Sequence, residues 1–160
     1  MDFAKSLAGF GVATLLALPL GYAPAHAAGT VDIEADSMEI IDADHKTIFR
    51  GNVVAKRPTD TIQADEMVVS SSDEKQADGS NKSITSFVDA KGNVTIKARD
   101  AVITGDTAKF DVRHDQLVVG GDVKVVQGQT LLRGKVLNVD MKTFHLQMSG
   151  GRVNGTFVPN

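Results

Sequence analysis

Ile62-Gln63-Ala64-Asp65-Glu66-Met67-Val68-Val69 decides the fold, because the same pattern stands 29 residues earlier as Ile33-Glu34-Ala35-Asp36-Ser37-Met38-Glu39-Ile40. It returns more loosely at residues 103–110, and a fourth copy at residues 132–139 carries lysine in place of the aspartate. A second motif, a glycine, a polar residue and a valine, lies between the copies and begins at Gly51, Gly92, Gly121 and Gly151. Repetition at a fixed period of about 29 residues predicts one supersecondary unit stacked on copies of itself.

One interval in the repeat is longer than the others. Asp65 and Asp106 are 41 residues apart, which is the usual period plus 12. The additional residues fall in the polar run 70–82, where we expect the insertion to form a loop.

The segments between the motifs are typical of β-strands. Short runs of β-branched residues recur, as at residues 53–55, 94–96 and 123–126, and no sustained helical apolar stripe follows residue 30. Turn-forming clusters come about every 14 residues outside the insertion. Strands of that length are longer than usual, which suggests that each one bends.

The repeat motifs predict where the bends lie. In residues 62–69 the apolar side chains change from even to odd positions at Asp65, and such a change of face requires a bulge or corner. The recurring aspartates are therefore interpreted as corner residues whose carboxylates accept backbone N–H bonds, and the glycines as the matching corners. Each strand then passes from one sheet to the opposite one. The expected fold is all-β, a twisted antiparallel β-jelly-roll of two facing sheets built from repeats of about 29 residues.

The N-terminal residues are typical of an export signal. Residues 6–20 are apolar or small, Lys5 precedes them, and Ala25-His26-Ala27 fits a small-x-small cleavage site. We expect residues 1–27 to be a cleaved signal peptide and residues 28–160 to form a single domain. An uncleaved membrane anchor is the alternative, but the apolar stretch is short for a membrane span.

Composition and motifs argue against several functions. The net charge of −3 gives no support for nucleic-acid binding, and the absence of cysteine excludes thiol chemistry. The histidines after the leader are too far apart for a metal site, and no nucleophile elbow is present. The aspartates recur at the same position of the repeat, which indicates a structural role, whereas a catalytic acid would occur once. The sequence therefore predicts no enzyme, no metal and no cofactor.

A set of apolar residues is expected to face the space between the two sheets. Aromatic residues are scarce, with seven Phe, one Tyr and no Trp in the whole chain, so this space is filled by small and aliphatic side chains. Two interpretations stay open: a closed core, or an incompletely filled gap that suits a flexible apolar ligand. The set comprises Val31, Ile33, Ile62, Met67, Val94, Ile96, Phe110, Val112, Leu117, Val119 and Leu137.

The repeated Ile-x-Ala-Asp-x-Met, the segment Phe49-Arg50-Gly51-Asn52-Val53 and Gly105-Asp106 resemble the OstA-like domain family over about residues 30–155. The resemblance is strongest to the periplasmic lipopolysaccharide transport members of Gram-negative bacteria. It implies a V-shaped jelly-roll whose interior binds the acyl chains of lipopolysaccharide (lipid A). The candidate lipid-binding residues are Val31, Ile33, Ile62, Met67, Val94, Ile96, Phe110, Val112 and Leu117.

The resemblance also implies partners. It implies a head-to-tail homo-oligomer that bridges the two membranes, and contacts with LptC-like and LptD-like OstA domains. The residues agree, because the first strand, near Val31 and Ile33, and the last strand, near Val153 and Thr156, carry few charges and would expose pairing edges. Two alternatives remain: a periplasmic adaptor that pairs edges without lipid, and an LptC-like anchored partner.

Overall fold

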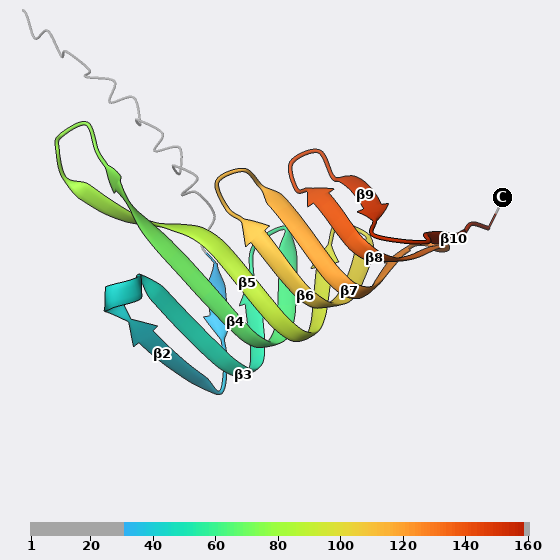
Figure 1. Ribbon diagram of the computed structural model, residues 1–160, viewed down its shortest axis with the longest axis horizontal. Coiled ribbons are helices and arrows are strands. Elements are labelled where there is room, and N and C mark those ends of the chain that lie inside the picture. The colour runs from blue at the N-terminus through green and yellow to red at the C-terminus, as the bar shows by residue number, and fades with distance from the viewer. Residues whose placement is uncertain (1–30, 159–160) are drawn as a thin grey trace, which may run out of the picture.

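The computed structural model describes residues 31–158, which form ten β-strands and one 3-10 turn, η1 (Asp42–Asp44). The expected signal peptide, residues 1–27, lies outside the described residues. The strands form one antiparallel sheet in the order β1-β3-β4-β5-β6-β7-β8-β10, with β2 on β3 and β9 on β8 (Figure 1). The strands are β1 (Asp32–Glu34), β2 (Ser37–Ile41), β3 (Lys46–Lys56), β4 (Asp60–Lys75), β5 (Asn81–Ala98), β6 (Ala101–Asp111), β7 (Gln116–Gln127), β8 (Thr130–Asp140), β9 (His145–Ser149) and β10 (Asn154–Thr156).

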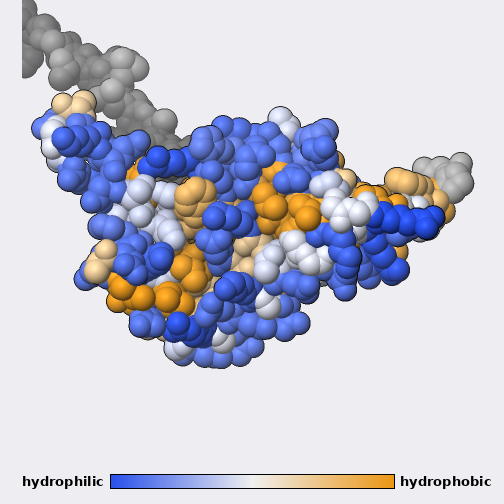
Figure 2. All heavy atoms as spheres, viewed as in Figure 1, coloured by the Kyte–Doolittle hydropathy of each residue, from blue (hydrophilic) through white to orange (hydrophobic). Residues whose placement is uncertain are grey.

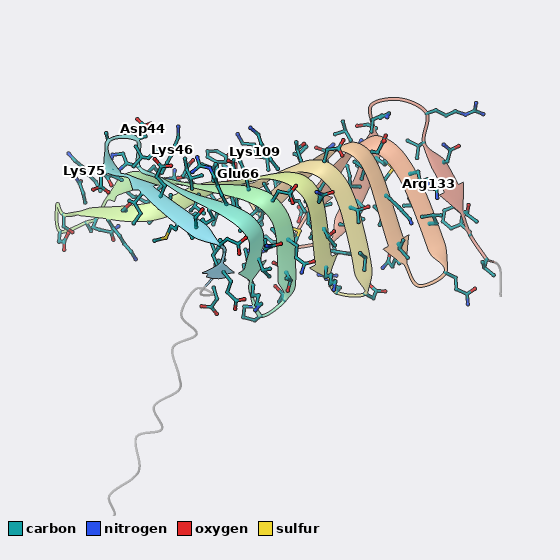
Figure 3. All side chains as sticks on the ribbon, turned by 90° about the horizontal axis from the view of Figure 1, so that it is seen from below. Asp44, Lys46, Glu66, Lys75, Lys109 and Arg133 are labelled. Atoms are coloured by element: carbon teal, nitrogen blue, oxygen red, sulfur yellow. The ribbon has the colours of Figure 1, made fainter. Side chains whose placement is uncertain are left out.

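The sheet folds along a line of corners into two facing layers. Each long strand from β3 to β7 shifts its register near its middle, for example between Lys91 and Val94 and between Thr104 and Thr107. One layer runs from β2 to β9 and the other from β1 to β10, and Figure 3 shows the strands bending from one into the other. The expected all-β jelly-roll with antiparallel facing layers is thus confirmed, and both layers belong to a single hydrogen-bonded sheet.

The repeated aspartates and glycines meet at these corners. The side chain of Asp65 lies against Gly92 of the next strand, and Asp36 lies against Gly51 in the same way. Gly92 has φ of +75°, a conformation that glycine adopts at little cost. The carboxylates accept hydrogen bonds from asparagine side chains, from Asn52 Nδ2 to Asp36 at 2.9 Å and from Asn93 Nδ2 to Asp65 at 2.8 Å. The expected backbone N–H donors are replaced by these amides.

In the last two glycine motifs a charged residue, Asp122 or Arg152, stands where the earlier motifs have asparagine. Asp106 lies against Gly121, and the next residue is Asp122 where the earlier corners have asparagine. Lys135 of β8 binds Asp122, with Nζ 2.6 Å from Oδ1. The lysine that replaces the fourth aspartate therefore compensates an additional acid on the preceding strand. Its hydrogen bond and charge lower the pKa of Asp122 and raise that of Lys135.

Replacing Lys135 by methionine should raise the pKa of Asp122 toward its ordinary range, because the ammonium that favours the carboxylate is removed. The depressed pKa contributes stability above the unfolded-state pKa, and this contribution is lost as pH falls through the folded pKa. The variant should therefore lose less stability on acidification. Carboxyl NMR titration of Asp122 measures the pKa directly, and an unchanged value in the variant would contradict the pairing.

The insertion after β4 is the one part of the topology that the sequence analysis predicts wrongly. Residues 70–82 do not form a loop, because β4 and β5 extend through most of them as a paired hairpin with its turn near Gly79. Serine and threonine side chains tolerate a solvated ladder, so a polar run remains compatible with strand. Ser72 and Ser86 face each other across this hairpin, with their hydroxyl oxygens 2.6 Å apart. The hairpin projects beyond the other strands of the molecule (Figure 1).

The core lies between the two layers and is densest from β4 to β8. Rows of directly opposite residues cross the sheet on its inner face, and one row reads Met38, Phe49, Met67, Ala90, Ala108, Val119, Leu137 and Met148. Met67, Ile96, Ile103, Val119, Leu137 and Val139 are fully buried. Aliphatic side chains thus close the space between the layers over most of its length.

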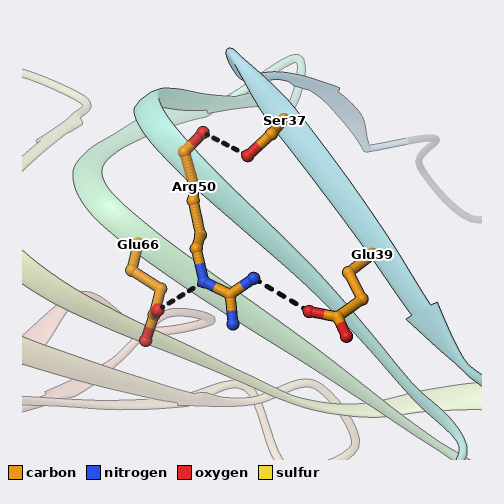
Figure 4. Close-up of polar contacts among 4 residues, drawn as sticks. All are labelled: Ser37, Glu39, Arg50 and Glu66. Atoms are coloured by element: carbon orange, nitrogen blue, oxygen red, sulfur yellow. Dashed lines mark hydrogen bonds and ion pairs between the residues drawn. The ribbon is translucent and has the colours of Figure 1, made fainter.

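A charged cluster on the outer face fixes the edge strand β2 to the sheet. Arg50 of β3 contacts Glu39 of β2 through Nη1 at 2.9 Å and Glu66 of β4 through Nε at 3.1 Å (Figure 4). The hydrogen bonds to Glu39 and then to Glu66 raise the pKa of Arg50. Ser37 Oγ also donates to the Arg50 carbonyl at 3.4 Å. Three neighbouring strands are therefore linked by one guanidinium.

Candidate functional site

A cavity of about 440 Å³ opens between the two layers at the end of the sheet that carries β1 and β2. This volume falls within the range of ligand pockets in proteins, about 300–1,000 Å³. Nine of its twelve lining residues are apolar. The lining comprises Val31, Ile33, Ala55, Arg57, Asp60 and Ile62 from the β1–β10 side, and Val69, Ile84, Thr85, Val88, Phe110 and Val112 from the β2–β9 side.

The structure separates the nine candidate lipid-binding residues into two groups. Five of them line the cavity: Val31, Ile33, Ile62, Phe110 and Val112. The other four, Met67, Val94, Ile96 and Leu117, lie in the closed core with at most 1% of their surface exposed. Lipid contact by any of these residues stays a prediction, but only the first group borders an open space.

Sequence reasoning missed several lining residues. Val69 belongs to the same apolar run as Met67, and its position two residues along the strand indicated the same face. Ile84 and Val88 lie on β5, beyond the loop expected at residues 70–82, and were not included in the apolar set. Their side chains extend the apolar wall toward the hairpin.

A partly buried ion pair lies at the cavity wall. Arg57 and Asp60 flank the turn between β3 and β4, and the guanidinium binds the carboxylate through Nε at 2.8 Å and Nη2 at 2.7 Å. The side chain of Asp60 is 4% exposed and that of Arg57 is 22% exposed. Thr59 Oγ1 donates to the same carboxylate at 3.0 Å. The guanidinium also stacks over the Phe110 ring, 4.6 Å from its centroid.

This arrangement is better suited to binding a ligand than to catalysing a reaction. An apolar cleft with one engaged ion pair can bury a flexible hydrocarbon chain and leaves a polar group at its wall. Residues 31–158 contain no cluster of side chains arranged to hold a metal ion. No helix within these residues has the length and apolar character needed to span a membrane.

Both ends of the sheet expose unpaired strand edges. The chain crosses the corner once at each end, so β1 and β2 form one continuous edge (residues 31–41, the first edge) and β9 and β10 form the other (residues 145–156, the last edge). Val31 and Ile33 lie on the first edge and Val153 and Thr156 on the last, and pairing of these edges with a partner stays a prediction. Each edge is longer than the terminal strands expected from the sequence. Figure 2 shows apolar surface in patches between hydrophilic rims, including one near β10.

Comparisons with known proteins agree with this architecture. An uncharacterised protein of Rhizobium meliloti (strain 1021) is 32% identical over 129 residues, which are 77% of this chain and 68% of that protein. The crystal structure of LptH from Pseudomonas aeruginosa, described as the LptA-homologous periplasmic component of the lipopolysaccharide transport device, superposes with a TM-score of 0.68. That match has 16% sequence identity and covers 81% of this chain and 96% of LptH, and it shows a shared fold.

The family model covers most of the sheet. The model described as "LptA/(LptD N-terminal domain) LPS transport protein" matches residues 32–144, from the first strand to the turn before β9. This is a family of transport components and not of enzymes, and its match includes the corner motifs up to Lys135 and all of the cavity lining except Val31. The chain belongs to the family of LptA and LptD N-terminal domain lipopolysaccharide transport proteins.

Proposed function

We propose that this chain carries lipopolysaccharide through the periplasm by holding its acyl chains in the cavity between the two layers. The apolar cavity at the open end of the folded sheet is the observation that supports this proposal, because its wall is made from nine apolar side chains of both layers. In a transport protein of this family, such a space provides a water-free environment for hydrocarbon. Residues 1–27 would direct export and then be removed, with residues 28–160 acting as one domain.

We further propose that several copies stack head to tail and bridge the inner and outer membranes. The first and last edges support this, since exposed backbone N–H and C=O groups are templates for pairing with another chain. A first edge on a last edge is a heterologous contact, which extends into a filament unless it closes. LptC-like and LptD-like domains would take the same edges at the two ends of the bridge.

A photo-crosslinking amino acid at Ile33 or Val112 should capture lipopolysaccharide when the protein is purified from the periplasm. Both side chains line the cavity, on opposite walls. The same probe at Val118 should capture none, because Val118 is exposed and lies opposite Lys109 on the outer face. Immunoblotting of the crosslinked band for lipopolysaccharide provides the measurement.

A probe at Ile96 distinguishes the cavity from the closed core. Ile96 shares the inner row of Ile62 but is fully buried, so capture there should be weak unless the layers separate on loading. Equal capture at Ile33, Ile96 and Val118 would contradict an interior site. Capture of proteins at the edges without any lipid at Ile33 or Val112 would instead favour the adaptor function.

A further inference from the structure

The number of strands in the sheet determines how a second copy can follow the first. Eight chain segments cross the line of corners, and neighbouring segments are antiparallel throughout. The first segment is β1 continued by β2, the next six are the single strands β3 to β8, and the last is β9 continued by β10. The first edge passes from the β1–β10 layer to the β2–β9 layer, and the last edge passes in the opposite direction. A first edge placed beside the last edge of another copy therefore continues the antiparallel alternation. The β1–β10 layers of the two copies then adjoin, and so do the two β2–β9 layers.

The inner apolar rows end, at the first edge, in side chains that are exposed to solvent. Met38 and Ile40 of β2 are 59% and 61% exposed, although each stands in a row whose central members are buried. At the opposite end, these same two rows finish at Met148 and Leu146 of β9. If the rows continue into a second copy, Met38 falls beside Met148 and Ile40 beside Leu146. A slip of one residue would turn Met38 and Ile40 to the outer face.

The corner sequence gives the same alignment independently. Corners alternate along the sheet between a charged residue and a glycine motif, beginning with Asp36 and finishing with Gly150-Gly151. The charged residue is an aspartate at three corners and Lys135 at the fourth. The next corner in this series would carry a charged residue, and the first edge of a second copy provides Asp36. Arg152 follows the final glycine at the position held by Asp122 in the preceding unit, and Asp122 pairs with the following corner residue, Lys135.

The two edges differ in charge. Residues 31–41 contain four acids, Asp32, Glu34, Asp36 and Glu39, and no base, whereas residues 145–156 contain Arg152 and His145 and no acid. Lys56 pairs with Glu34 and Arg50 with Glu39. Among residues 31–158, neither Asp36 nor Arg152 takes part in an ion pair. Two first edges together would oppose acid with acid, which disfavours an isologous contact.

We propose that the last edge binds the first edge of a second copy in one register, with Met38 beside Met148, Ile40 beside Leu146, and Asp36 paired with Arg152. This inference rests on the proposed head-to-tail stacking of a first edge on a last edge, and it assigns the alignment of that contact to named residues. Arg152 then takes the place that Asp122 has inside the sheet and Asp36 takes the place of Lys135, so the signs of the pair are reversed. The inner rows of two copies become continuous, and the surface of Met38 and Ile40 is covered.

Cysteine crosslinking tests the register, because the chain contains no cysteine of its own. Directly opposite residues of antiparallel strands are about 4.5–5.5 Å apart at Cα, within the range a disulfide spans. Mixing Met38→Cys protein with Met148→Cys protein under mild oxidation should give a heterodimer. Ile40→Cys with Met148→Cys is the slipped control and should crosslink at least about tenfold more slowly. Circular dichroism under reducing conditions verifies that each variant is folded.

A charge exchange tests the Arg152 pair. Arg152→Asp should weaken self-association about tenfold, since it places two acids at the junction. Combining it with Asp36→Lys in the same chain recreates the Asp122–Lys135 arrangement across the junction and should restore association. Sedimentation against protein concentration measures both, and Asp36→Lys alone shows the effect on the monomer.

The outcomes separate this inference from the function it rests on. Efficient crosslinking in the slipped pair, or association unchanged by Arg152→Asp, would overturn the register while leaving head-to-tail stacking intact. Disulfide homodimers of Met38→Cys alone would show that first edges meet each other, and would overturn both the register and the head-to-tail stacking. A protein that remains monomeric at high concentration would refute stacking itself, and with it this inference, although lipid capture at Ile33 would be unaffected.

Discussion

Replacing Gly92 by alanine should lower the free energy of unfolding by about 3 kcal/mol. The positive φ of Gly92 is strained for a residue with a side chain, at about 1–2 kcal/mol. The new Cβ would also overlap the carboxylate of Asp65 and stand 2.9 Å from its Cβ, and such overpacking adds about 1–3 kcal/mol. Urea unfolding followed by circular dichroism measures the difference.

Gly79→Ala is the matched control for this substitution. Gly79 has φ of +84°, close to that of Gly92, but a Cβ there would meet no atom within 4 Å. The control should therefore lose only the conformational part, about 1 kcal/mol. If both variants lose the same amount, the contact between aspartate and glycine does not determine the corner, and the repeat would require another explanation.

The corners could be predicted from the sequence because their information is local. A change in the alternation of apolar residues at Asp65 and a glycine motif at Gly92 are both visible in a few residues, and the register shifts occur there. The recurrence of these motifs then predicted the two facing layers. The insertion was mispredicted because a polar composition does not distinguish a solvated hairpin from a loop.

The cavity could not be located from the sequence, because periodicity identifies the face of a residue and not the distance to the opposite layer. Ile33 and Ile96 belong to one inner row, yet Ile33 borders open space and Ile96 is fully buried. The difference depends on how far the layers diverge at the end of the sheet. The ion pair at the cavity wall was missed for a similar reason, since residues 57–60 indicated a turn but gave no sign that a carboxylate would be buried.

Replacing Arg57 by methionine should destabilise the protein by about 2 kcal/mol. The substitution leaves the carboxylate of Asp60 buried, with the Thr59 hydroxyl as its remaining side-chain donor. Removing one partner of a fully buried pair costs about 3–5 kcal/mol, and the partial exposure of Arg57 reduces this figure. Methionine keeps most of the apolar contact with Phe110 and loses the cation–π interaction, which contributes about 0.5–1 kcal/mol of the change.

Two further variants identify the buried charge as the cause. Adding Asp60→Asn to Arg57→Met removes the unpaired charge and should recover more than half of the lost stability. Lys56→Met, at the neighbouring residue, breaks an exposed pair with Glu34 and should change stability little, because water already solvates both groups. The Arg57 effect should also persist in high salt, since mobile ions screen a buried pair weakly. A double variant no more stable than Arg57→Met would show that guanidinium packing, and not the charge of Asp60, holds the turn at the cavity wall.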